Sequence, residues 1–199
     1  MGELPAISKS RLEAFSDGVL AIIITIMVLE LRVPQGKDFS ALRPLIPTAL
    51  AYVLSFVYVG IYWNNHHHML HATKRVTGSI LWANLHLLFW LSLFPFVTGW
   101  MGENGLAPIP AALYGIVLFM AGIAYWILER RIIAAEGAGS ILALAVGQDR
   151  KGILSVVIYA VAIPFAFFGH WISQCLYVVV ALIWLVPDRR IEKALSSVE

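Results

Sequence analysis

Long apolar stretches, interrupted by short polar segments, run along almost the whole chain. Six of them are long enough, or nearly so, to cross a bilayer core about 30 Å thick, for which a helix needs roughly 20 residues. They predict helices at about 15–33, 44–63, 80–98, 108–128, 152–168 and 171–186. The last two are short and are separated only by Gly169 and His170, so we expect a helical hairpin there.

The composition is typical of a membrane protein. Of the 199 residues, 60% are hydrophobic and 13% are charged, which is more apolar surface than a soluble globule of this size could bury. Disordered chains and nucleic-acid-binding modules are excluded on the same grounds, and a single cysteine, Cys175, excludes a disulfide scaffold. We therefore predict an all-α, polytopic protein that is embedded in the lipid bilayer and has no nucleic-acid partner.

Positive charges are distributed unequally between the two predicted sides of the membrane. With six passes, both termini share one side with the second-to-third and fourth-to-fifth connections. That side holds 11 of the 14 Lys and Arg residues, namely Lys9, Arg11, Lys74, Arg75, Arg130, Arg131, Arg150, Lys151, Arg189, Arg190 and Lys193. The other side holds Arg32, Lys37 and Arg43. Because basic residues concentrate on the cytoplasmic side, we expect both termini in the cytoplasm.

A polar cluster opens the first predicted helix, with Arg11, Ser16 and Asp17 close together. In one interpretation it is a helix start, where Ser16 or Asp17 caps the first amides and Arg11 lies among lipid headgroups. In another, the three side chains form a buried polar network, because charged groups at membrane depth need partners. The two interpretations are compatible.

The same helix then presents Ile22, Ile26 and Leu29 on one face, with Thr25 beside them. Nearly every transmembrane helix has such a face, so spacing alone does not assign these residues to a pore.

The motif Arg11-x-x-x-Phe15-Ser16-Asp17 resembles the signature of the transmembrane protein 175 family, the endolysosomal potassium channels and their bacterial relatives. The similarity extends over nearly the whole chain. Its further elements are Tyr62-Trp63-x-x-His66-His67, Asn84, Ser92, Pro95-Phe96-x-Thr98 and Gly102-Glu103.

This resemblance implies a single six-helix channel domain over residues 1–199, without a re-entrant pore loop, enzymatic activity or cofactor. Potassium and other monovalent cations would pass through a pore lined by the first helix of each subunit of a homotetramer, in the cell membrane of a prokaryote. The narrowest ring would be Ile22, followed by Thr25 and by further apolar rings at Ile26 and Leu29. A narrow ring of alkyl groups offers an ion no replacement for its hydration shell and therefore acts as a gate.

The resemblance also implies that Arg11, Ser16 and Asp17 pack against a histidine of the second helix. The expected histidine is His67, with His66 and His68 as alternatives.

Two other kinds of function stay open at this stage. The cluster from His66 to His71 could bind a metal ion or haem, since imidazole is a common metal ligand and His67 and His71 lie one turn apart. A small secondary transporter is the other, although such carriers usually hold acids near the middle of the membrane. Asp17 and Glu30 lie near opposite ends of the first predicted helix, and no other predicted helix interior contains an acid.

Overall fold

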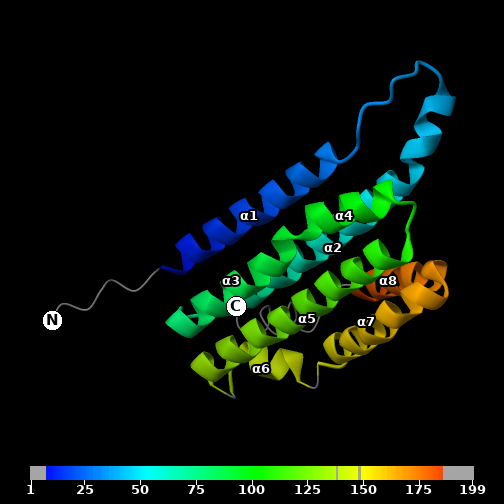
Figure 1. Ribbon diagram of the computed structural model, residues 1–199. Coiled ribbons are helices and arrows are strands. Elements are labelled where there is room, and N and C mark those ends of the chain that lie inside the picture. The colour runs from blue at the N-terminus through cyan, green and yellow to red at the C-terminus, as the bar shows by residue number, and fades with distance from the viewer. Residues whose placement is uncertain (1–7, 138, 148, 186–199) are drawn as a thin grey trace.

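A computed structural model shows the chain as a bundle of helices (Figure 1) and describes residues 8–137, 139–147 and 149–185. These residues contain no strand, which confirms the all-α class. The elements are α1 (Lys9–Leu29), the short 3-10 helix η1 (Phe39–Leu45), α2 (Ile46–His71), α3 (Gly78–Ser92), α4 (Phe94–Glu103), α5 (Pro108–Glu136), α6 (Ile141–Val146), α7 (Arg150–Phe168) and α8 (His170–Leu185).

Five helical segments of the described chain are long and apolar enough to cross a membrane. They are Lys9–Leu29, Phe39–His71, Gly78–Glu103, Pro108–Glu136 and Arg150–Phe168, and a shorter apolar helix covers Trp171–Leu185. This result confirms a multi-pass membrane protein.

Several helices extend beyond their predicted apolar cores. Helix α1 begins at Lys9 instead of near residue 15, so Ser16 and Asp17 lie inside it and do not cap its start. Helix α2 continues past residue 63 to His71, and α5 continues past residue 128 to Glu136. The apolar part of a sequence ends where the helix leaves the membrane, whereas the helix itself continues until a residue interrupts its backbone hydrogen bonds. Helix α5 stops at Gly137, whose φ of 95° is a conformation that L side chains rarely adopt.

The third predicted helix is divided into α3 and α4 at Leu93. Pro95 lies in the first turn of α4, where it has no amide hydrogen to donate to the preceding turn. The broken segment still crosses the bundle as one apolar stretch, Gly78–Glu103.

Helix α1 lies along one side of the bundle, whereas α7 and α8 form a hairpin on the other (Figure 1). Between them, α5 packs on α3, α4, α7 and α8, and α2 packs on α1, α4 and α8. Hydroxyl groups join the interior helices. Ser55 of α2 shares hydrogen bonds with Thr98 of α4 (2.7 Å) and Tyr114 of α5 (3.0 Å), and the Tyr58 hydroxyl donates to the Tyr177 carbonyl of α8 (2.6 Å).

Helices α2 and α4 approach each other closely at Gly102. A Cβ atom added to Gly102 would lie 2.6 Å from the Cα atom of Thr48, well inside van der Waals contact. Small residues permit such contacts between helices in membranes, where packing replaces the hydrophobic effect as the force between helices.

We expect Gly102→Ala to push α2 and α4 apart and to lower stability by about 1–3 kcal/mol, the usual range for overpacking. The matched control is Gly60→Ala, because no heavy atom lies within 4 Å of a Cβ added at Gly60. The measurement is the midpoint temperature of thermal denaturation of each purified variant in detergent. Equal midpoints for the two variants would contradict the predicted close contact.

Candidate functional site

The predicted pore residues lie together on the outer face of α1. Ile22, Ile26 and Leu29 are 58%, 44% and 75% exposed, and Thr25 is also exposed. The opposite face of α1, formed by Leu12, Ser16, Leu20, Ile23 and Met27, is buried against the neighbouring helices. One helix therefore presents a buried face to its own chain and an uncovered apolar face, with one hydroxyl, to its surroundings.

The Thr25 hydroxyl on this face is oriented by its own helix. Its Oγ1 atom donates a hydrogen bond to the Ile22 carbonyl oxygen at 2.9 Å. Since the hydrogen is used in this bond, the oxygen presents lone pairs outward, and lone pairs attract a cation.

A chain of hydrogen bonds connects the buried face of α1 to α3 and α2. The Ser16 hydroxyl donates to the Leu12 carbonyl (2.9 Å) and accepts from Asn84 Nδ2 (3.0 Å), and Asn84 Oδ1 lies 2.7 Å from His66 Nε2. Because Ser16 uses its only hydrogen on Leu12, Asn84 must donate to it, and the Asn84 oxygen then accepts from His66 Nε2. All three side chains of Ser16, Asn84 and His66 are buried.

The histidine in this series of hydrogen bonds is His66, one of the two alternatives, and the expected His67 takes no part in it. His67 is exposed, and its ring lies 6.3 Å from Trp63 and is stacked at 6.2 Å on His71. Adjacent helical residues point about 100° apart, so only one of two neighbouring histidines can face the core.

Asp17 and Arg11 lie at the edge of the same region. Asp17 Oδ1 accepts a hydrogen bond from Trp63 Nε1 at 3.1 Å, which ties α1 to α2 a second time. Arg11 is exposed beside a cavity of about 290 Å³ that Phe15 and Asn84 also line. Its guanidinium makes no hydrogen bond or ion pair with Ser16, Asp17 or any other residue in the described part of the chain.

Two residues of this site carried no assigned role in the sequence. Asn84 stands alone as an amide within the apolar segment of α3, and a lone polar group inside a membrane helix needs a partner, which is a signal for a buried contact. Trp63 closes an apolar stretch and looks like an interfacial residue, so its bond to Asp17 had no signal in the sequence.

The histidines of α2 do not converge on one point, because His66 faces the core while His67 and His71 face outward. Among the described residues there is no group of three or more His, Cys, Asp or Glu side chains that could hold a metal ion.

Glu129 corrects the expectation that no helix interior beyond the first holds an acid. Because α5 extends to Glu136, Glu129 lies within it and is only 3% exposed. Its Oε1 atom has no hydrogen-bond partner among the described residues and lies 4.0 Å from Arg130 Nε.

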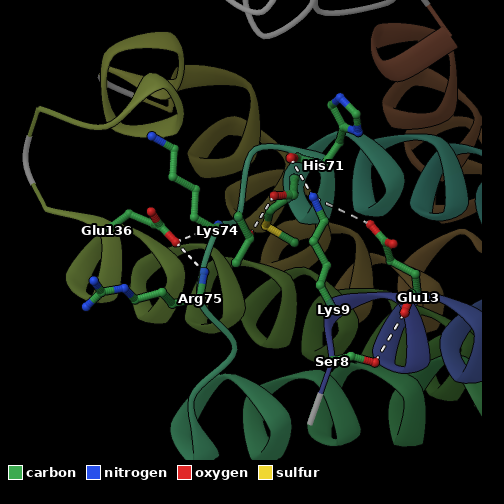
Figure 2. A network of polar contacts seen from close by, with 10 residues as sticks. Ser8, Lys9, Glu13, His71, Lys74, Arg75 and Glu136 are labelled. Carbon is green, nitrogen blue, oxygen red and sulfur yellow. Dashed lines mark hydrogen bonds and ion pairs between the residues drawn. The ribbon is translucent and has the colours of Figure 1, made fainter. Parts of the chain in front are cut away.

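Polar contacts tie α1, α2 and α5 together at one end of the bundle (Figure 2). Lys9 Nζ donates to the His71 carbonyl at 2.8 Å. Glu136 Oε1 accepts from the backbone amides of Lys74 (2.7 Å) and Arg75 (2.9 Å). The start of α1, the end of α2 and the end of α5 therefore lie together, and α7 begins near the last turns of α5.

The basic residues that the sequence assigned to the cytoplasmic side lie at this end, as far as the structure describes them. They are Lys9, Arg11, Lys74, Arg75, Arg130, Arg131, Arg150 and Lys151. At the opposite end, Arg32 Nη2 lies 2.7 Å from Glu103 Oε1. Arg189, Arg190 and Lys193 lie outside the described residues.

Comparisons with known proteins point to one family. The sequence model of the family described as endosomal/lysosomal potassium channel TMEM175 matches residues 11–95. A Chryseobacterium sp. (strain P1-3) protein named a potassium channel is 57% identical over 190 residues, which cover 96% of this chain and 99% of that protein. The Homo sapiens protein named endosomal/lysosomal proton channel TMEM175 is 40% identical over 96 residues, or 42% of this chain and 19% of the human protein.

The fold is similar to a crystal structure described as a lysosomal potassium-selective channel TMEM175 homolog from Chamaesiphon minutus. The TM-score is 0.77 at 27% sequence identity, and the match covers 90% of this chain and 97% of that one.

We expect Asn84→Leu to destabilise the protein by about 1–3 kcal/mol, because it leaves His66 Nε2 and the Ser16 oxygen buried with fewer partners. Asn64→Leu, at an exposed position of α2, is the matched control. Thermal denaturation of the purified variants is the measurement. Equal stability of the two variants would contradict a structural role for the chain of hydrogen bonds.

Proposed function

The chain belongs to the TMEM175 family, and on this premise we propose that it is a potassium-permeable cation channel through which ions pass passively. The observation that carries the proposal is the outer face of α1, where Ile22, Ile26 and Leu29 are exposed beside the oriented hydroxyl of Thr25. The opposite face of the same helix is buried against neighbouring helices. One such helix cannot surround an axis. We therefore propose that four copies assemble with this face of α1 lining a central pore.

In this assembly Ile22 forms the narrowest ring, with Ile26 and Leu29 as further apolar rings. A narrow alkyl ring excludes water and blocks ions, so the pore conducts only when the ring widens enough for a partly hydrated cation. Potassium loses its water more readily than sodium, which favours potassium at such a ring. The lone pairs of Thr25, directed outward by its bond to the Ile22 carbonyl, favour cations over anions.

We propose six membrane passes with both termini in the cytoplasm and no re-entrant loop. Support comes from the five long apolar segments, the apolar helix α8 and the collection of basic residues at one end of the bundle. A prokaryotic cell carrying this chain would hold it in the cell membrane.

The polar network of Ser16, Asn84 and His66 positions the pore helix in this proposal. It prevents α1 from rotating about its own axis, because rotation would leave buried polar groups without partners. Asp17 supports the same orientation through Trp63, and Arg11 stays near the headgroups beside the start of the helix.

Glu129 favours one alternative, a carrier that couples cation movement to protons. A buried acid whose oxygen has no hydrogen-bond partner among the described residues is a feature that coupled transporters use. Glu129 lies near the end of α5, away from the proposed pore face of α1, and this position favours the channel. A channel and a carrier differ in thermodynamics and can be separated by experiment.

For wild-type protein in liposomes under a potassium gradient, we expect a current whose reversal potential follows the potassium gradient. Protein-free vesicles are the control, and sodium and proton gradients are applied in separate runs. A reversal potential that follows the proton gradient at fixed potassium would reject potassium permeation, and flux that saturates and exchanges with solute would support the carrier.

We expect Ile22→Ser to raise cation conductance several-fold, because a small polar side chain both widens and wets the ring. The matched control is Ile116→Ser, which alters a partly exposed isoleucine (39%) on α5, a helix distant from the proposed axis. Single-channel currents in planar bilayers provide the measurement. Unchanged conductance in a folded Ile22→Ser protein would place the constriction elsewhere.

A further inference from the structure

A cavity of about 450 Å³ lies between α2, α5, α7 and α8. Its lining is almost entirely aliphatic and aromatic and includes Tyr58, Tyr62, Trp126, Val156, Tyr159 and Trp184. A space of this size and character is in the range of sites that bind small apolar molecules.

The cavity opens on the lateral surface of the bundle. Trp126, Ile153 and Val157 line it and are 46%, 61% and 53% exposed. This surface belongs to α5 and α7, whereas α1 packs on α2, α3 and α4, on the other side of the bundle (Figure 1). With α1 at a central axis, the opening therefore faces lipid.

The length of the cavity matches one leaflet of the bilayer. Along α7 its lining runs from Asp149 to Tyr159, which is roughly 15 Å at the helical rise per residue. The hydrocarbon core is about 30 Å thick, so a single acyl chain of one leaflet spans about this distance.

Two cation–aromatic pairs stand at the basic end of the cavity. The Arg130 guanidinium carbon lies 5.7 Å from the Trp126 ring centre, and Lys151 Nζ lies 5.9 Å from the Trp184 ring centre. Both indole rings line the cavity. Each positive charge is thereby held beside the cavity at the basic end of the bundle, where we expect the lipid phosphates of a membrane.

Asp149 and Glu129 are the described acids closest to this end of the cavity, and each has a neighbouring group of opposite charge or polarity. Asp149 Oδ1 accepts from the Gly152 amide at 3.1 Å and caps the positive N-terminus of α7. Glu129 is buried next to Arg130. Among the described residues at this end, Arg131 and Arg150 add to the positive charge, and the Glu136 carboxylate accepts from the backbone amides of Lys74 and Arg75.

We propose that this cavity binds one anionic phospholipid, with an acyl chain between α5 and α7 and the phosphate between Arg130 and Lys151. Basic pockets between transmembrane helices bind the headgroups of negatively charged lipids. The proposal rests on the protein spanning a membrane and on the proposed position of α1 at a central axis, not on ion conduction, and its test has a binding readout.

The experiment is native mass spectrometry of the purified oligomer in detergent, titrated with dioleoyl phosphatidylglycerol or with dioleoyl phosphatidylcholine. We expect retention of phosphatidylglycerol in preference to phosphatidylcholine, and no displacement by inorganic phosphate at equal concentration. Equal retention of the two lipids would overturn the proposal, because it would indicate a nonspecific lipid shell. Displacement by inorganic phosphate would overturn the lipid as occupant.

Variants separate the headgroup contact from the chain contact. The double variant Arg130→Gln/Lys151→Gln should weaken phosphatidylglycerol binding about tenfold or more and leave phosphatidylcholine unchanged. Lys74→Gln/Arg75→Gln removes the same charge from the same end of the bundle, away from the cavity, and should leave binding as in wild type. Equal losses in the two double variants would overturn the proposal.

Gly122→Leu should fill the cavity and reduce binding of phosphatidylglycerol. A Cβ at Gly122 would lie 3.6 Å from Val156 Cγ2, so the first atom fits and the rest of the leucine extends into the space. Ile123→Phe, at a neighbouring lining position, replaces it if the leucine variant does not give a monodisperse oligomer. Wild-type binding by a folded filling variant would overturn the assignment of the acyl chain to this cavity.

Discussion

The orientation of α1 depends on a hydrogen bond between two buried side chains. Asn84 donates to the Ser16 oxygen at 3.0 Å and is held from behind by His66. In such surroundings an unpaired polar group is more costly than a missing apolar contact. The bond therefore fixes the rotation of α1 together with the hydrogen bonds from Trp63 to Asp17 and from Lys9 to the His71 carbonyl. Everything that α1 presents outward, from Phe15 to Leu29, follows from this rotation.

A second set of hydroxyl contacts gives the rest of the bundle a definite register. Ser55, Thr98 and Tyr114 join three helices at one point, and Tyr58 reaches α8 through the Tyr177 carbonyl. Van der Waals packing alone permits helices in a membrane to slide, whereas polar groups that bind across helices permit one arrangement. Helix α1 thus packs against helices whose relative positions are themselves fixed by hydrogen bonds.

The sequence predicted the helices better than it predicted their ends or their inward faces. Apolar stretches reveal the membrane-crossing part of a helix, so the polar continuation of α2 to His71 and the division of α3 from α4 before Pro95 were not visible in them. The choice between His66 and His67 could not be made from the sequence either, since neighbouring residues differ by about 100° in direction and the phase of α2 depends on tertiary contacts. Glu129 was placed outside a helix for the same reason.

The uncovered apolar face of α1 also bears on how the protein is made. Lipid tails accommodate a row of Ile22, Ile26 and Leu29 as well as another protein surface does, so water gives no force that drives subunits together inside the membrane. A newly inserted chain can therefore complete its internal hydrogen bonds and remain stable alone in the bilayer. In the four-copy assembly proposed above, folding and assembly are then separate events. The second depends on subunit concentration and on shape, so the abundance of the chain in its membrane would set how much of it is assembled.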